Sequence, residues 1–226
     1  MAETEPVDNS TPTPSSDKED TSEVALWTIP NQLTLARLAM SVVFFVILGM
    51  ETHGTFPPES RSLVLVVATV LFVLAVLTDF LDGYLARRWK MVSTFGRIAD
   101  PFADKIIICG GFIMLIGIAP RLVEPWFAMI IVVREFLVSG LRSFFESRGV
   151  AFGAVFIGKL KMVVQSIAIP VTLGFVALYP EGTKDSTVQT SFYWVVVASL
   201  AVTLVLTVAS CADYIQRAIR LARSNR

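Results

Sequence analysis

Six long apolar segments dominate this chain of 226 residues. Hydrophobic residues make up 54% of the sequence and charged residues only 17%, and a soluble domain of this size has too little interior to bury so much apolar surface. A helix needs about 20 residues to cross the hydrocarbon core of a bilayer. We therefore predict an all-α integral membrane protein with six transmembrane helices. The expected spans are residues 32–50, 62–81, 105–119, 126–141, 156–179 and 192–213.

The first 24 residues differ from the rest of the chain in composition and charge. They are rich in Thr, Ser, Pro and acidic residues, contain no aromatic residue, and have a net charge of −6. They also lack the basic start and apolar centre of a signal peptide. Such a segment cannot bury enough apolar surface to fold. We expect a disordered acidic tail over residues 1–24 and a single six-span membrane domain over residues 25–226.

Basic residues are distributed unequally between the connections of the expected spans. Connections 51–61, 120–125 and 180–190 contain one base each, whereas the opposite side of the membrane is rich in Arg. Short loops on the cytoplasmic side carry the excess of Lys and Arg in membrane proteins. We therefore expect a multi-pass protein of the cell (inner) membrane, with both termini on the cytoplasmic side.

Four aspartates flank the connection between the second and third expected spans. On each side of the connection, residues recur three or four positions apart, which places them on one face of a helix. The first stripe comprises Asp79, Asp82, Gly83 and Ala86, and the second comprises Gly96, Asp100 and Asp104. Because the two spans are antiparallel and the link is short, we expect the stripes to face each other and the four carboxylates to converge. The small residues between them allow a helix or ligand to approach closely.

Four carboxylates at the edge of a membrane need a balancing positive charge. On insertion scales each acid costs about 2.5–3.5 kcal/mol at a helix centre, and less near the interface. Oxygen ligands without a usable histidine or thiol favour Mg²⁺, Mn²⁺ or Ca²⁺ over zinc, and two such ions can clamp a pyrophosphate. Ordinary interfacial ion pairing is the alternative, but two matched stripes favour a metal site. The bases available for that pairing are Arg87, Arg88, Arg97 and Lys105.

This segment resembles the signature of the CDP-alcohol phosphatidyltransferase family, D-x2-D-G-x2-A-R-x8-G-x3-D-x3-D, at all eight fixed positions. The resemblance implies a homodimeric enzyme that depends on Mg²⁺ or Mn²⁺. It implies that Asp79, Asp82 and Asp100 are metal ligands. Asp104 would lie near the metals and act as the general base on the acceptor hydroxyl. The residues implied to border the nucleotide donor are Gly83, Ala86, Arg87 and Gly96.

The start of the first span is similar to the P-N-x-L-T-x-x-R opening of bacterial phosphatidylglycerophosphate synthases. The similarity implies that Asn31, Thr34 and Arg37 lie near the nucleotide. Read without the resemblance, residues 31–37 form an interfacial helix that begins at a proline. In that reading Arg37 serves only to orient the protein in the membrane.

Two further segments resemble the same synthases and carry the bases expected to bind the acceptor. The stretch 134–142 is similar to their R-E-x3-S-G-L-R run, and the stretch 158–165 to a G-K-x-K-T-x-x-Q run in which Met162 here replaces threonine. The implied acceptor-phosphate ligands are Arg134, Arg142, Lys159 and Lys161. Glu135 projects about 100° away from Arg134, so we expect it to be satisfied separately. The alternatives are an intramembrane ion pair for Arg134 and lysines that extend to lipid phosphates.

Together these residues indicate a phosphorylated acceptor. Several cations suit the dianionic phosphate of glycerol 3-phosphate, whereas an uncharged alcohol would not need them. The resemblance thus implies transfer of a phosphatidyl group from CDP-diacylglycerol to glycerol 3-phosphate, with no nucleic acid partner. Inositol-phosphate and cardiolipin-forming enzymes of the family remain alternatives. Intramembrane prenyltransferases and cation transporters fit less well, because the chain has one acidic motif at one membrane end.

Overall fold

The computed structural model describes the backbone of residues 29–89, 94–149, 156–180 and 186–224, and within these it leaves out the side chains of residues 29–31, 80–101, 222 and 224. The expected tail at residues 1–24 lies outside the described residues. Six α-helices and no strand occur in the described parts, which confirms the all-α prediction and its six helices. The helices are α1 (Ile29–Thr52), α2 (Arg61–Trp89), α3 (Thr94–Ile118), α4 (Pro125–Ser147), α5 (Phe156–Leu178) and α6 (Thr187–Ser224), with a short 3-10 helix, η1 (Pro58–Ser60), before α2.

Several helices are longer than the apolar segments that predicted them. The helix α6 contains 38 residues, which corresponds to about 57 Å at 1.5 Å per residue. A hydrocarbon core is only about 30 Å thick, so apolarity marks where a helix lies in lipid and not where the helix ends. For the same reason α2 and α3 continue beyond their apolar parts and carry both aspartate stripes on helical backbone.

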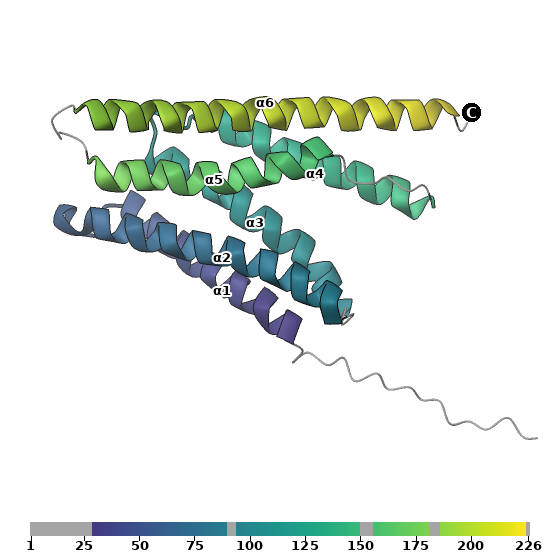
Figure 1. Ribbon diagram of the computed structural model, residues 1–226, viewed down its shortest axis with the longest axis horizontal. Helices are drawn as coiled ribbons and strands as arrows, with labels where there is room; N and C mark the ends of the chain where they lie inside the picture. Colours follow the sequence, from purple (N-terminus) through teal and green to yellow (C-terminus); the bar gives the residue numbers. More distant parts are fainter. Residues whose placement is uncertain (1–28, 90–93, 150–155, 181–185, 225–226) are drawn as a thin grey trace, which may run out of the picture.

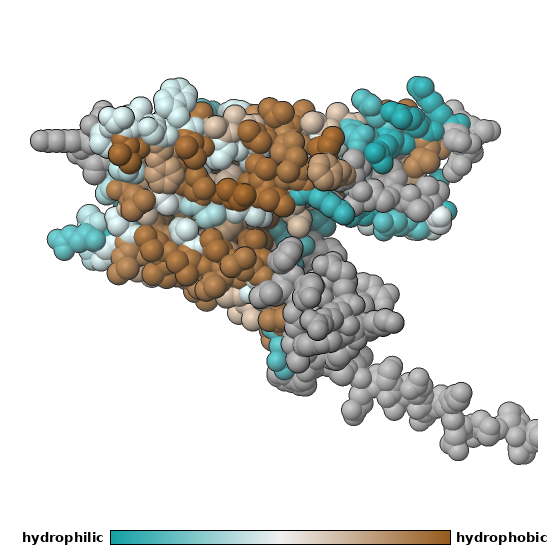
Figure 2. Space-filling view, in the orientation of Figure 1, coloured by the Kyte–Doolittle hydropathy of each residue, from teal (hydrophilic) through white to brown (hydrophobic). Residues whose placement is uncertain are grey.

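The surface of the bundle is suited to lipid. Four described segments are long and apolar enough to cross a membrane: Gln32–Thr52, Pro58–Asp79, Phe156–Leu178 and Thr187–Leu221. At most 39% of the residues in any of these windows are buried within the protein. Their remaining apolar side chains therefore face outward. Figure 2 shows this apolar surface over the centre of the bundle, and a hydrophilic surface at the C-terminal end of α6.

The helices run alternately in opposite directions, so that the starts of α1 and α3 and the ends of α2, α4 and α6 lie at the right in Figure 1. The helix α1 packs against both α2 and α3, α2 packs against α5, and α6 packs against α4 and α5. We call the end with the starts of α1 and α3 the aspartate end. Because α1 packs against both α2 and α3, which carry the two aspartate stripes, a residue of α1 can contact both helices.

The core between α1, α2, α3 and α5 is apolar and closely packed. The rings of Phe44 on α1 and Phe72 on α2 lie 5.5 Å apart between centroids, and both side chains are fully buried. Gly111 on α3 faces this core, where a Cβ atom would lie 2.8 Å from Ile169 Cδ1 and 3.5 Å from Phe72 Cε2. The absence of a side chain at Gly111 thus allows α3 to approach α2 and α5.

We predict that Gly111→Leu destabilises the protein by about 1–3 kcal/mol, because a large side chain overpacks this core. Gly174→Leu on α5 is the matched control, since a Cβ at Gly174 meets nothing within 4 Å. Both changes gain the higher helix propensity of leucine, so their difference isolates packing. Thermal unfolding in detergent measures the effect. Equal unfolding temperatures for the two variants would show that Gly111 is not needed for close packing.

Candidate functional site

A buried arginine joins the two aspartate helices. Arg37 on α1 is 1% exposed. Its Nη1 atom lies 2.5 Å from Asp79 Oδ1 on α2 and 3.1 Å from Asp104 Oδ1 on α3. Because α1 packs against both helices, its guanidinium reaches both carboxylates at once. Arg37 is therefore not a surface charge that only orients the protein, and one carboxylate from each predicted stripe does converge on a common point.

The remaining members of the aspartate motif occupy the same helices. Their backbone is helical in α2 and α3, but their side chains lie outside the described residues. These members are Asp82, Gly83, Ala86, Arg87, Gly96 and Asp100. No group of three or more potential metal ligands occurs among the described side chains. The predicted four-carboxylate site is therefore described at two of its four positions.

The convergence of Asp79 and Asp104 suits a cation. Two carboxylates from separate helices share one positively charged nitrogen, and their side chains remain 30% and 34% exposed. Carboxylate oxygens are the ligands that Mg²⁺ and Mn²⁺ prefer. In a medium of low dielectric constant, carboxylates brought this close need a positive charge to balance them. The donor atoms present thus fit a divalent metal, and Arg37 supplies positive charge at the same place.

The other predicted donor-binding residues of α1 precede Arg37 on the same helix. Thr34, one helical turn before Arg37, is buried. Asn31 is the third residue of α1, and its side chain lies outside the described residues. Residues 31–37 are continuous with the first span, so the expected interfacial segment and the membrane helix form one element.

A second polar cluster lies between α4, α5 and α6. Arg134 on α4 is buried, and its Nε atom donates a hydrogen bond to Ser210 Oγ on α6 at 3.2 Å. Lys161 on α5 is 2% exposed and forms an ion pair with Glu135 on α4. Arg142, two turns after Arg134, donates from Nη2 to Tyr214 Oη at 3.0 Å. Three of the four cations predicted to bind the acceptor therefore belong to one cluster.

The expectation that Glu135 is satisfied apart from Arg134 is wrong. Arg134 Nη1 lies 3.1 Å from Glu135 Oε1, and the same oxygen is the partner of Lys161. The 100° between adjacent residues describes where the side chains leave the helix, whereas the arginine has enough length to turn back toward its neighbour. Glu135 thus joins a lysine and an arginine that were both predicted to bind the acceptor phosphate.

Lys159 differs from the other three predicted acceptor ligands. Its side chain is exposed, and no hydrogen bond or ion pair joins it to another described residue. Lys161, two positions later, faces the opposite way and is buried, so it does not extend to lipid headgroups. The helical period separates the two lysines by about 200°, which explains why only one of them enters the cluster.

The contribution of α6 to this cluster was not predicted from the sequence. Ser210 and Tyr214 contact the two arginines, and Gln165 on α5 donates from Nε2 to Thr207 Oγ1 at 3.3 Å. A signal was present: hydroxyl side chains recur at intervals of three and four residues within an otherwise apolar helix. These residues are Thr203, Thr207, Ser210 and Tyr214, and all four are buried.

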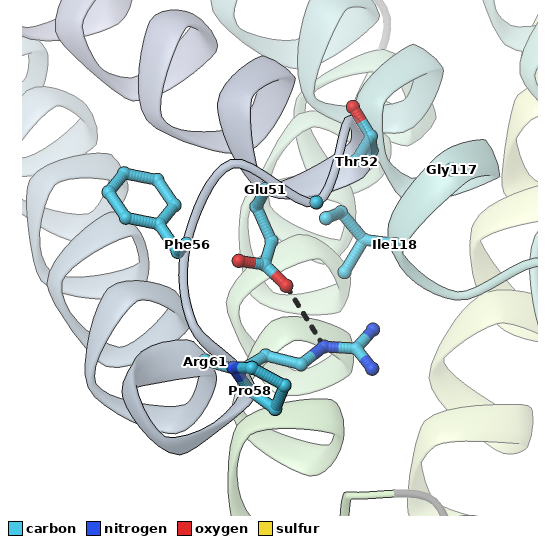
Figure 3. A pocket seen from close by; sticks show the side chains of 8 residues that line it. Glu51, Thr52, Phe56, Pro58, Arg61, Gly117 and Ile118 are labelled. Atoms are coloured by element: carbon cyan, nitrogen blue, oxygen red, sulfur yellow. Dashed lines mark ion pairs between the residues drawn. The ribbon is translucent and has the colours of Figure 1, made fainter.

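A pocket of about 290 Å³ lies at the opposite end of the bundle, between the end of α1, the start of α2 and the end of α3. Figure 3 shows Glu51 and Arg61 in its wall, with Arg61 Nε 3.0 Å from Glu51 Oε1. This ion pair links the two helices at the turn between them. The pocket lies far along the helices from Arg37 and contains none of the predicted site residues, so we assign it no part in the chemistry.

Comparison with known proteins agrees with the motif at the aspartate end. The model of the CDP-alcohol phosphatidyltransferase family matches residues 27–209. The chain belongs to this family. The chain is similar to proteins named CDP-diacylglycerol–glycerol-3-phosphate 3-phosphatidyltransferase. In Bacillus subtilis the identity is 34%, over 66% of this chain and 77% of the relative. In Mycoplasma pneumoniae it is 34%, over 75% and 77%, and in Rickettsia bellii 36%, over 63% and 73%.

Membership of the CDP-alcohol phosphatidyltransferase family makes the chain a membrane-bound transferase of phospholipid biosynthesis. The family generally uses a divalent metal ion, which agrees with the oxygen ligands that meet at Asp79 and Asp104. The match covers α1 to α5 and continues into α6 as far as residue 209. The aspartate end and the cations of the second cluster fall within it, whereas Ser210 and Tyr214 of α6 lie just beyond it.

We predict that Asp79→Asn and Asp104→Asn each lower the free energy of unfolding of the metal-free protein by about 1–3 kcal/mol. The reason is that each change weakens a charged partner of a buried guanidinium. Thermal unfolding in detergent with chelator measures the loss.

The matched control for this prediction is Asp213→Asn on α6. Its carboxylate pairs with the half-exposed Arg217 at 3.3 Å, a surface pair worth less than about 0.5 kcal/mol. If all three variants unfold at the same temperature, the ion pairs of Arg37 do not stabilise the aspartate end.

Proposed function

We propose that this enzyme transfers the phosphatidyl group of CDP-diacylglycerol to glycerol 3-phosphate, forming phosphatidylglycerol phosphate and releasing CMP. The names of its relatives support this assignment. The observation that carries it is the charge of the cluster between α4, α5 and α6. There Arg134, Arg142 and Lys161 are accompanied by one acid, Glu135, among the described side chains in contact.

The charge of this cluster matches a phosphate monoester. Three cations and one carboxylate leave a net charge of +2 in a partly buried region. Buried charges persist where they are paired, so a cluster with this excess favours a dianionic ligand. Guanidinium groups donate two parallel hydrogen bonds to phosphate, which adds direction to the attraction. We propose that Arg134, Arg142 and Lys161 bind the phosphate of the acceptor and that the exposed Lys159 contributes least.

The donor is proposed to bind at the aspartate end. Asp79, Asp82, Asp100 and Asp104 would hold Mg²⁺ or Mn²⁺. When bound, these ions supply positive charge to the diphosphate and to the departing CMP. Arg37 adds a fixed cation that contacts two of these aspartates. The remaining residues proposed to border the nucleotide are Asn31, Thr34, Gly83, Ala86, Arg87 and Gly96.

Asp104 is proposed as the general base. The acceptor hydroxyl oxygen forms a bond to the phosphorus of the phosphatidyl group, the bond from that phosphorus to CMP breaks, and Asp104 takes the hydroxyl proton. In the structure, Asp104 Oδ1 accepts a hydrogen bond from Arg37 Nη1. To act as a base, its carboxylate must turn one oxygen to the acceptor hydroxyl, and its one-third exposure leaves it accessible for this contact.

The proposed reaction takes place at the cytoplasmic side of the cell (inner) membrane, in a homodimer. The distribution of Lys and Arg between the connections supports this orientation. An inositol phosphate acceptor is the second candidate, because its phosphate suits the same cations. A cation transporter is less well supported, since the described acids at the aspartate end are paired with arginine and do not extend through the membrane.

We predict that purified protein releases CMP from CDP-diacylglycerol only when both glycerol 3-phosphate and Mg²⁺ or Mn²⁺ are present. The carboxylate ligands need a divalent ion to bind a diphosphate. Chelator should abolish the release, and re-addition of metal should restore it. The measurement is CMP formation with each acceptor offered alone. Full turnover in chelator would refute the metal site, and equal turnover with inositol phosphate would refute the choice of acceptor.

We predict that Arg134→Gln, Arg142→Gln and Lys161→Gln each reduce kcat/KM for glycerol 3-phosphate by about tenfold to a hundredfold. The estimate follows from about 1.5–3 kcal/mol for a charge-assisted contact. Steady-state kinetics should show little change in the KM for CDP-diacylglycerol. Lys159→Gln is the comparison and should have the smallest effect. The acceptor site would be wrong if these variants raised the donor KM and left the acceptor KM unchanged.

A further inference from the structure

Tyr214 on α6 contacts both arginines of the acceptor cluster. Its side chain is 2% exposed. Arg142 Nη2 donates a hydrogen bond to its Oη atom at 3.0 Å. The Cζ atom of Arg134 lies 5.9 Å from the centroid of the ring, and that of Arg142 lies 6.0 Å from it. One aromatic ring thus contacts two guanidinium groups that come from the same neighbouring helix.

The two guanidinium groups need such a contact to hold their positions. Arg134 and Arg142 are eight residues apart on α4, so they lie on similar faces about 12 Å apart along the axis. Both side chains are long, have several rotatable bonds and carry the same charge, so they tend to move apart. The ring of Tyr214 attracts both cations through its face. Ser210, one turn earlier on α6, holds the Nε atom of Arg134.

The third helix encloses this arrangement. At Gly158 on α5, a Cβ atom would lie 3.5 Å from Tyr214 Oη and 3.9 Å from Arg134 Nη2. The ring also packs in an apolar cluster with Val138 and Phe145 of α4. Tyr214 is therefore confined by α4 and α5, and its hydroxyl group has a fixed place beside the arginines.

We propose that Tyr214 is a positioning residue that holds Arg134 and Arg142 in one geometry for the phosphate of the acceptor. This inference depends on the proposed acceptor site. It assigns to α6, which contributes no phosphate-binding cation to the described cluster, the preference for a phosphorylated acceptor over a neutral alcohol. A tyrosine that served only for packing would be replaceable by phenylalanine without loss, because the apolar contacts of the ring would remain.

The test compares Tyr214→Phe and Tyr214→Leu in steady-state kinetics with glycerol 3-phosphate and with glycerol. Tyr214→Phe removes the hydrogen bond to Arg142 and keeps the ring, so the KM for glycerol 3-phosphate should rise about tenfold, with kcat and the donor KM unchanged. Tyr214→Leu also removes the ring and should raise this KM further. The preference for glycerol 3-phosphate over glycerol should fall in the same order.

A second measurement does not depend on catalysis. Glycerol 3-phosphate should raise the unfolding temperature of the wild-type protein in detergent, and a tenfold higher concentration should be needed for the same rise in Tyr214→Phe. Tyr193→Phe on α6 is the matched control, because its ring contacts Phe175 and Trp194 at the other end of the helix. This control should behave as the wild type in both measurements.

The outcomes separate the inference from the proposed function. If Arg142→Gln raises the KM for glycerol 3-phosphate and Tyr214→Phe does not, the positioning role is overturned and the acceptor site stands. If neither variant changes that KM, the acceptor site itself is wrong. If Tyr214→Leu fails to fold, Tyr214→Phe still decides, since it preserves the packing of the ring. If Tyr214→Phe raised the KM for CDP-diacylglycerol as much as the KM for glycerol 3-phosphate, the inference would also be overturned.

Discussion

The ion pairs of Arg37 are the interaction on which the aspartate end depends. A guanidinium that is almost completely buried cannot remain there without negative partners, and α2 and α3 each provide one. These contacts join three helices at the end where both aspartate stripes lie. The apolar core around Phe44 and Phe72 determines how closely the helices pack, but it does not orient any carboxylate. The charge of Arg37 specifies which faces of α2 and α3 turn toward α1.

Buried charges are also paired in the second cluster, but there the balance of charge is the opposite. At Arg37, one cation is shared by two acids, whereas at Glu135 one acid is shared by two cations. The first arrangement is suited to additional positive charge and the second to additional negative charge. The two clusters therefore complement different parts of one reaction, a metal-bound diphosphate donor and an anionic acceptor. Their separation on different helices keeps the two sets of charges from neutralising each other.

Much of the fold could be predicted from the sequence, because a bilayer allows few structures for an apolar segment of about 20 residues. The aspartate stripes were predictable for a similar reason, since helical periodicity is a local property. The partners of Arg37 were not predictable in this way, because they depend on how α1 packs against α2 and α3 in three dimensions. The contact of Arg134 with Glu135 depends on how a long side chain turns, which spacing alone does not specify. Tyr214 shares the helical spacing of the hydroxyl residues of α6, but spacing alone does not identify the residues that they contact. Its contact with the arginines depends on how α6 packs against α4.

The length of α6 affects how the two substrates meet. Tyr214 lies 27 residues after the start of α6 at Thr187, or about 40 Å along the helix, which is further than the hydrocarbon is thick. In the proposed reaction, the small acceptor therefore arrives by diffusion in three dimensions through water and never enters the lipid. The donor, held by its acyl chains, arrives by diffusion in two dimensions within the bilayer. The rate of encounter with each substrate would then respond to different variables, the concentration in solution for one and the mole fraction in the membrane for the other.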